Sequence, residues 1–127
     1  MVDTSDKTKK YDVEDAEYNF TEMVKQIKPK TFKLNDGQEI GITKNHIGFV
    51  ADEIESVIPK KNENIVNKND EGIRMLNYVK MNSILWGAVR EQQTKIEHLE
   101  ACMFEMMEEI KELKGKKKPK AKAKAEN

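Results

Sequence analysis

The chain has 127 residues, which suits one domain with extensions. Charged residues make up 36% of it and apolar residues 37%, which excludes a large monomeric core but allows a small core completed by oligomerisation. With no apolar run long enough to cross a bilayer, no signal-peptide pattern and a single cysteine, Cys102, we expect no membrane partner and no intrachain disulfide.

Apolar residues at helical spacing predict a first helix over 13–27, with Asp12 as its N-cap and Pro29 just beyond its end. The following segment, Thr31–Ile42, alternates apolar and polar residues on both sides of the turn signal Asn35-Asp36-Gly37. This pattern predicts a β-hairpin.

Short elements are expected to follow this hairpin. A third strand is predicted at Asn45–Val50, and it leads into a helical turn at Ala51–Val57 that ends at Pro59. After an exposed loop rich in Asn and Lys, strands are predicted at 65–66 and 73–76.

The longest pattern begins near Tyr78 and continues to about Leu113. Apolar residues recur there at alternating steps of three and four, the a and d positions of a heptad repeat, although Gln92 and Asn82 interrupt the seam. A single helix has nowhere to bury such a stripe, so we expect oligomerisation through Leu85, Val89, Ile96, Leu99, Met103, Met106, Ile110 and Leu113. The alternative is an antiparallel helix that packs on its own domain.

Charges beside the seam favour parallel helices. Lys95 at g and Glu100 at the following e are opposite in charge, and so are Glu109 and Lys114. The a and d residues themselves allow two strands or three.

The formal net charge is zero, but it is unevenly distributed. From Lys116 onward there are six Lys and one Glu, so the tail carries about +5 and the rest about −5. Gly115 and Pro119 are expected to end the long helix, leaving 115–127 as a disordered Lys-rich tail. This tail allows weak, nonspecific nucleic-acid binding, although a solubilising or localisation role is the preferred interpretation.

Three segments resemble one known family. His46 to Pro59 reads HIGFVADEIESVIP, Tyr78 is followed by LWGAVREQQ at Leu85–Gln93, and Thr4-Ser5-Asp6 precedes Lys10. Together they resemble the intramolecular chaperone auto-processing domain, also called the peptidase S74 domain, of phage tail spikes and endosialidases. The family usually has an Arg and an apolar residue shortly before its catalytic lysine, where this chain has Thr8 and Lys9, and Gln where this chain has Asp52.

The resemblance implies an α+β fold: a small helix and β-hairpin globular part followed by a long C-terminal coiled-coil helix, homotrimeric. It divides the chain into a passenger or linker stub at 1–4, the globular part at 5–77, a trimerising helix at 78–114 and the tail at 115–127. It also implies a C-terminal chaperone that helps an N-terminal fibrous passenger to fold and then releases itself by autoproteolysis. The expected location is the virion, or the host cytoplasm during viral assembly.

By the same resemblance, the cut lies between Thr4 and Ser5, and the enzyme is a single-turnover serine endopeptidase with a Ser/Lys dyad. Ser5 Oγ attacks the Thr4 carbonyl, Lys10 accepts the proton, and water then hydrolyses the ester. A lysine acts as a base only when it is neutral, so burial or nearby positive charge has to lower its pKa from about 10.4. We expect that burial to come from a neighbouring subunit that covers Lys10.

Other interpretations stay open beside this one. The first alternative is a coiled-coil trimerisation module that has lost cutting. No cofactor or metal is expected, because His46 and His98 are far apart in the sequence and only one cysteine is present. Phe49 and Trp86 are interpreted as core residues.

Overall fold

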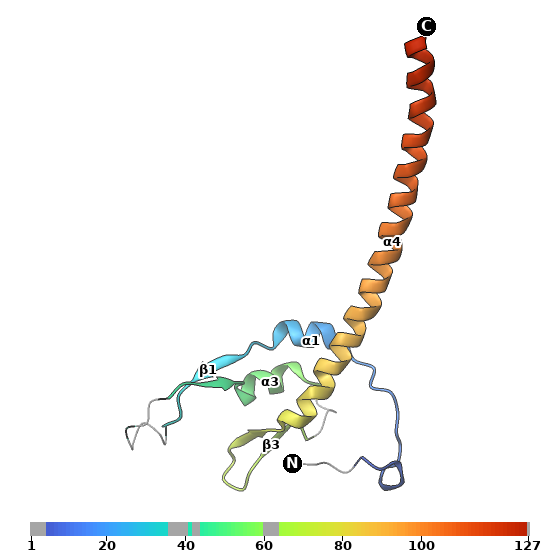
Figure 1. Ribbon diagram of the computed structural model, residues 1–127. Coiled ribbons are helices and arrows are strands. Elements are labelled where there is room, and N and C mark those ends of the chain that lie inside the picture. The colour runs from blue at the N-terminus through green and yellow to red at the C-terminus, as the bar shows by residue number, and fades with distance from the viewer. Residues whose placement is uncertain (1–4, 36–40, 42–43, 60–63, 127) are drawn as a thin grey trace.

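The structure, a computed structural model, describes residues 5–35, 41, 44–59 and 64–126, with side chains as far as residue 116. A small α+β part lies at one end, and a single long helix projects from it (Figure 1). The α+β class and the long C-terminal helix are therefore confirmed. In chain order the elements are η1 (Lys7–Lys9), α1 (Phe20–Gln26), β1 (Lys30–Phe32), β2 (His46–Gly48), α3 (Ala51–Val57), β3 (Val66–Lys68), β4 (Arg74–Leu76) and α4 (Tyr78–Glu126).

Helix α1 is shorter than the apolar spacing predicted, and the prediction that Asp12 caps it was wrong. The helix begins at Phe20, and the side chain of Asn19 caps it by accepting a hydrogen bond from the Glu22 N–H at 3.2 Å. Asp12 instead has a φ of 51°, a left-handed conformation that aspartate tolerates in turns. The residues before Phe20 cross the surface of α4, and this tertiary contact overrides their helical pattern.

Two short antiparallel pairs make up the sheets. β1 pairs with β2, the segment expected as a third strand, with Phe32 opposite His46 and Lys30 opposite Gly48. The second strand of the predicted 31–42 hairpin lies largely outside the described residues. β3 and β4 form the other pair, close to the two predicted strands, and the Asn69 side chain supports their turn by accepting two backbone hydrogen bonds at 2.9 Å.

The core lies where α1, α3 and the first turns of α4 meet. Its buried residues come from every part of the globular region: Met23, Ile54, Ile58, Ile65, Met81 and Ile84. Phe49 packs against this cluster, as predicted. Trp86 does not: its exposed fraction is 75%, so its interpretation as a core residue was wrong for the single chain.

Helix α4 begins at Tyr78, as predicted, but continues to Glu126, so the predicted end near Leu113 was wrong. Lysine and alanine are good helix formers, and extending a helix is much easier than starting one. These preferences outweigh the two stop signals at Gly115 and Pro119. Over the part of the chain that is described, no helix is long and apolar enough to cross a membrane.

Candidate functional site

The residues proposed for cleavage flank a single 3-10 turn, η1. Asp6 caps this turn: its Oδ1 accepts hydrogen bonds from the Thr8 N–H at 2.9 Å and from the Thr8 hydroxyl at 2.8 Å. Both bonds lower the pKa of Asp6, and the bond from the Thr8 N–H has the larger effect. A 3-10 turn advances about 2.0 Å per residue against about 3.3 Å for extended chain. The turn therefore brings Ser5, on one side, closer to Lys10 on the other.

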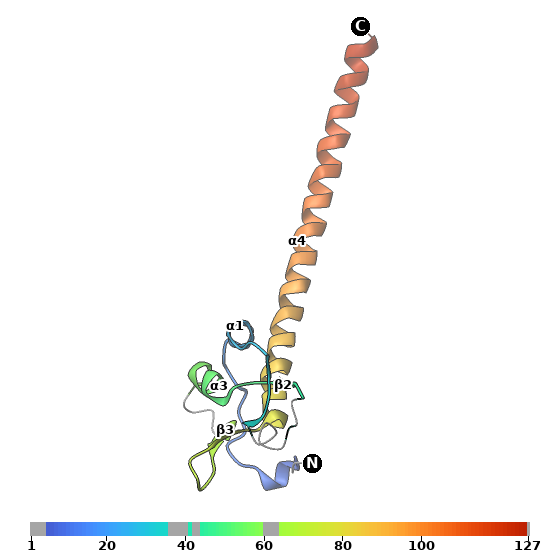
Figure 2. The same ribbon diagram turned by 90° about the vertical axis from the view of Figure 1, so that its left-hand side faces the viewer.

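Ser5 and Lys10 are both exposed to solvent, and no hydrogen bond joins them in the described part of the N-terminal segment. Thr4, on the other side of the expected cut, lies outside the described residues. From Ser5 onward, the segment before α1 lies along the side of the molecule, and η1 lies at the same end of the molecule as the base of α4, far from the C-terminal end of that helix (Figures 1 and 2). The isolated chain thus supplies the dyad residues without enclosing them.

The proposed oligomerisation residues form a solvent-exposed stripe on α4. All eight are between 48% and 62% exposed, from Leu85 in the third turn to Leu113. Beyond the globular part, α4 extends without a neighbouring element in either view (Figure 2). The described residues therefore provide no internal cover for this stripe, and the alternative of a helix packed along its whole length on its own domain is not what the structure shows.

Glu91, which the sequence did not single out for a role, fastens the N-terminal region to α4. Its carboxylate accepts hydrogen bonds from the Phe20 N–H at 2.9 Å and the Thr21 N–H at 2.7 Å, and a further one from the Thr21 hydroxyl. The Thr21 hydroxyl bond, followed by the Thr21 N–H, lowers the pKa of Glu91. A side chain 70 residues away thus satisfies the first free N–H groups of α1.

Two motif glycines are required by close packing. A Cβ on Gly87 would lie 2.4 Å from Cδ2 of the Phe20 ring, and one on Gly48 would lie 2.9 Å from the Tyr78 hydroxyl oxygen. Glycine inside a helix costs about 1 kcal/mol relative to alanine, so Gly87, in the third turn of α4, was itself a signal of such an approach. These contacts explain why glycine stands in both segments.

The acidic helix α3 is attached to the second hairpin by charge. Arg74 of β4 forms ion pairs with Glu55 at 2.6 Å and with Asp52 at 3.4 Å. Both interactions raise the pKa of Arg74; the hydrogen bond to Glu55 has the larger effect and the negative charge of Asp52 the next. Asp52, the position that departs from the usual motif, therefore has a structural partner in this chain.

The peptidase S74 family model, described as chaperone of endosialidase, matches residues 5–62. The match supports a domain of this family over that segment. It begins at Ser5, contains Lys10, and includes α1, the β1–β2 pair and α3, a little under half of the chain. No curated protein and no solved structure matches the chain.

The match confirms the resemblance over the central HIGFVADEIESVIP segment and the N-terminal residues. The helical segment at Leu85–Gln93 lies beyond the matched range, but it packs directly on it through Gly87 and Glu91. Among the described residues, no group of three or more His, Cys, Asp and Glu side chains is placed to hold a metal ion.

Proposed function

We propose that this chain is a C-terminal intramolecular chaperone that assembles as a homotrimer and assists the folding of a fibrous passenger attached to its N-terminus. The observation that carries the proposal is the exposed stripe of α4, eight apolar side chains on a helix joined to a segment of the chaperone-of-endosialidase family. Such a stripe is stable in water only when other helices cover it. The proposed setting is a virion or the host cytoplasm during viral assembly.

The arrangement of the termini supports this role. The N-terminal segment, where a passenger would be attached, lies near the base of α4, and the seam extends away from it (Figure 1). Three parallel helices would therefore hold three attachment points near one another at the same end. Bringing chain ends together reduces the loss of entropy that a trimeric passenger suffers when it folds.

We also propose that the chain releases itself by cutting between Thr4 and Ser5. Ser5 Oγ forms a bond to the Thr4 carbonyl carbon while Lys10 accepts the hydroxyl proton, and the Thr4–Ser5 C–N bond then breaks as the leaving nitrogen is protonated. The resulting ester is hydrolysed by water, which leaves a Thr4 carboxylate and restores the Ser5 hydroxyl. Because Lys10 is exposed in the single chain, a neighbouring chain or the passenger has to cover it before it can act as a base.

One structural observation favours a second candidate, a trimerisation module that does not cut. Ser5 and Lys10 are exposed, and no hydrogen bond joins them within the described residues. In that case the domain would stay attached to its passenger, and its chaperone role would rest on assembly alone.

A precursor with a trimeric fibrous passenger fused before Thr4 separates the two candidates. We expect a cut between Thr4 and Ser5, located by mass spectrometry of both fragments, and loss of the cut in Ser5→Ala and in Lys10→Ala. Lys33→Ala, at another exposed lysine, is the matched control and should cut normally. An uncut but trimeric parent precursor supports the module without cutting, and a monomer by light scattering refutes the assembly proposal.

A further inference from the structure

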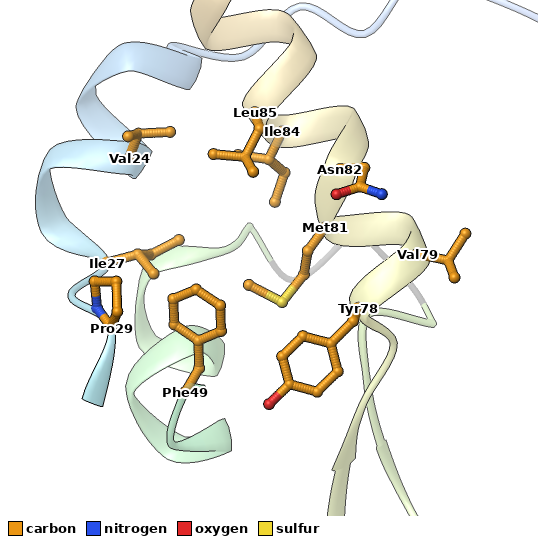
Figure 3. Close-up of a pocket in the computed structure, with 10 residues that line it drawn as sticks. All are labelled: Val24, Ile27, Pro29, Phe49, Tyr78, Val79, Met81, Asn82, Ile84 and Leu85. Atoms are coloured by element: carbon orange, nitrogen blue, oxygen red, sulfur yellow. The ribbon is translucent and has the colours of Figure 1, made fainter. Parts of the chain in front are cut away.

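A groove opens beside the first turns of α4. It has a volume of about 480 Å³, and apolar side chains from α1, from the residue after β2 and from α4 line most of it: Val24, Ile27, Phe49, Tyr78, Met81 and Leu85. Figure 3 shows Val24, Ile27 and Phe49 on one side of this space and Met81, Tyr78 and Leu85 on the other. An apolar hollow of this size, open to solvent in the single chain, is a candidate for covering by another molecule.

The groove is continuous with the seam of α4. In the heptad that places Val89 at a, Tyr78 and Leu85 are d residues and Asn82 is an a residue, and all three line the groove. The seam and the groove are thus one surface, and whatever pairs with the seam approaches the groove too.

The two flanks of the seam differ sharply near the groove. On the g flank, Met81 and Ala88 are 7% and 2% exposed because the chain's own globular part covers them. On the e flank, Trp86 is 75% exposed, and Val79, at the edge of the groove lining, is 48% exposed. In parallel coiled coils the g flank of one helix faces the e flank of its neighbour, so the exposed flank of one copy meets the globular part of the next.

The register identifies which side chain enters the groove. Residues at g contact the e residue five positions later on the neighbouring helix, the rule that pairs Lys95 with Glu100. The same offset pairs Met81, in the groove wall, with Trp86 of the neighbour. We propose that Trp86 of a second copy inserts into this groove. This inference rests on the parallel assembly of α4 helices in the proposed function, and it adds a specific contact between neighbouring copies.

The chemistry of the groove fits an indole ring. Tryptophan buries about 150–250 Å² when it is enclosed, and its ring N–H needs an acceptor there. The Asn82 side chain in the groove lining provides an amide oxygen, and the aromatic rings of Phe49 and Tyr78, 6.0 Å apart, provide faces for packing. The contact would also explain why the chain's single tryptophan is so exposed in one copy.

Because Trp86 is the only tryptophan, its fluorescence reports the contact directly in the intact chain. We expect blue-shifted emission and protection from acrylamide in the assembled protein, and red-shifted, accessible emission at dilutions where light scattering shows monomers. A second experiment tests whether another copy of the chain covers Trp86. Parent chains are refolded together with chains that lack tryptophan (Trp86→Phe), lack the native cysteine (Cys102→Ser) and carry a nitroxide quencher on Val24→Cys. Quenching of the parent tryptophan in such mixtures requires contact between copies.

The matched control carries the nitroxide on Glu105→Cys instead. Residue 105 lies 19 positions after residue 86 along α4, about 28 Å from it at 1.5 Å per residue, so little quenching of Trp86 is expected. A second comparison uses truncation: Trp86→Ala should raise the concentration for half-assembly by roughly tenfold or more, as for a buried aromatic contact. Phe104→Ala should not, since Phe104 is an aromatic residue that is 65% exposed at a b position outside the seam.

The outcomes separate this inference from the function it rests on. An oligomer whose tryptophan stays accessible to acrylamide, or is quenched equally from residues 24 and 105, overturns the groove contact and leaves assembly standing. Protection that needs the passenger, and is absent from the assembled domain alone, assigns the groove to the passenger and also overturns it. A monomer at all concentrations overturns both proposals.

Discussion

Replacing Gly87 with alanine tests the contact that joins the N-terminal region to α4. The added Cβ would lie 2.4 Å from Cδ2 and 2.5 Å from Cγ of the Phe20 ring. Ordinary contact begins at 3.4 Å, so the ring has to retreat by about 1 Å. Because Cγ is attached directly to the Phe20 Cβ, rotating the ring about its own axis does not remove the overlap. The Phe20 backbone has to move as well, and Glu91 holds its N–H.

The net effect is a balance of two terms. Overpacking of this kind costs about 1–3 kcal/mol, whereas alanine is favoured over glycine inside a helix by about 1 kcal/mol. Since the clash involves atoms close to the backbone, we expect a net loss of about 1–2 kcal/mol. That loss should lower the Tm by several degrees, measured by circular dichroism at fixed protein concentration.

Gly115→Ala is the matched control, because a Cβ there meets no atom within 4 Å. It gains the helix preference without the clash, so its Tm should stay level or rise. In a Phe20→Ala background, which lacks Cγ and the ring, Gly87→Ala should cost less than it does alone, and a double-mutant cycle would measure this difference as coupling. If Gly87→Ala proved as stable as the parent protein, the argument that glycine is needed for the Phe20 ring would be refuted.

Three further predictions concern charge, cleavage and assembly. Because hydrogen bonds from Thr21 hold the Glu91 pKa below its usual range, its contribution to stability is full above the ordinary carboxyl pKa and is lost as the pH falls through the lower folded value. Tm should therefore fall less steeply below about pH 5 in Glu91→Gln than in the parent protein. The same dependence of Tm on acid pH in both proteins would contradict this. Asp6→Ala removes the cap of η1 and should slow precursor cutting in a time course without changing the oligomer mass. Leu99→Ala should weaken assembly by about 2 kcal/mol or more per chain in sedimentation equilibrium, whereas His98→Ala, one position away but outside the seam, should not.

The sequence predicted the elements with strong local signals and missed those that depend on distant contacts. α3, the strands at 30–32, 46–48 and 74–76, and the start of α4 follow periodicity and stop signals, such as Pro59 after Val57, and they lie within two residues of the predicted positions. The first helix was predicted too long because 13–19 has helical spacing. Only the structure shows that this segment leaves the helix to cross α4.

The same distinction applies to the candidate site. The apolar seam is a property of one helix and could be predicted from its repeat. The role of Glu91 could not, because its partners, Phe20 and Thr21, are 70 or more residues away and carry no motif that points to it. Gly87 carried a partial signal, since a glycine in a helix interior indicates close approach, but the sequence does not say which residue approaches.

The family-like residues of α4 connect two surfaces through the same turns of one helix. Gly87 and Glu91 receive the start of α1, while Leu85 and Val89, two positions before each of them, face outward to the proposed neighbour. Any partner that covers Leu85 and Val89 stiffens the turns to which Phe20 is fastened. The place where the segment before Phe20 crosses α4 is then fixed relative to the other copies. This geometry supports a proposed order in which assembly precedes cutting, because a neighbour can enclose Ser5 and Lys10 only after the helices have aligned.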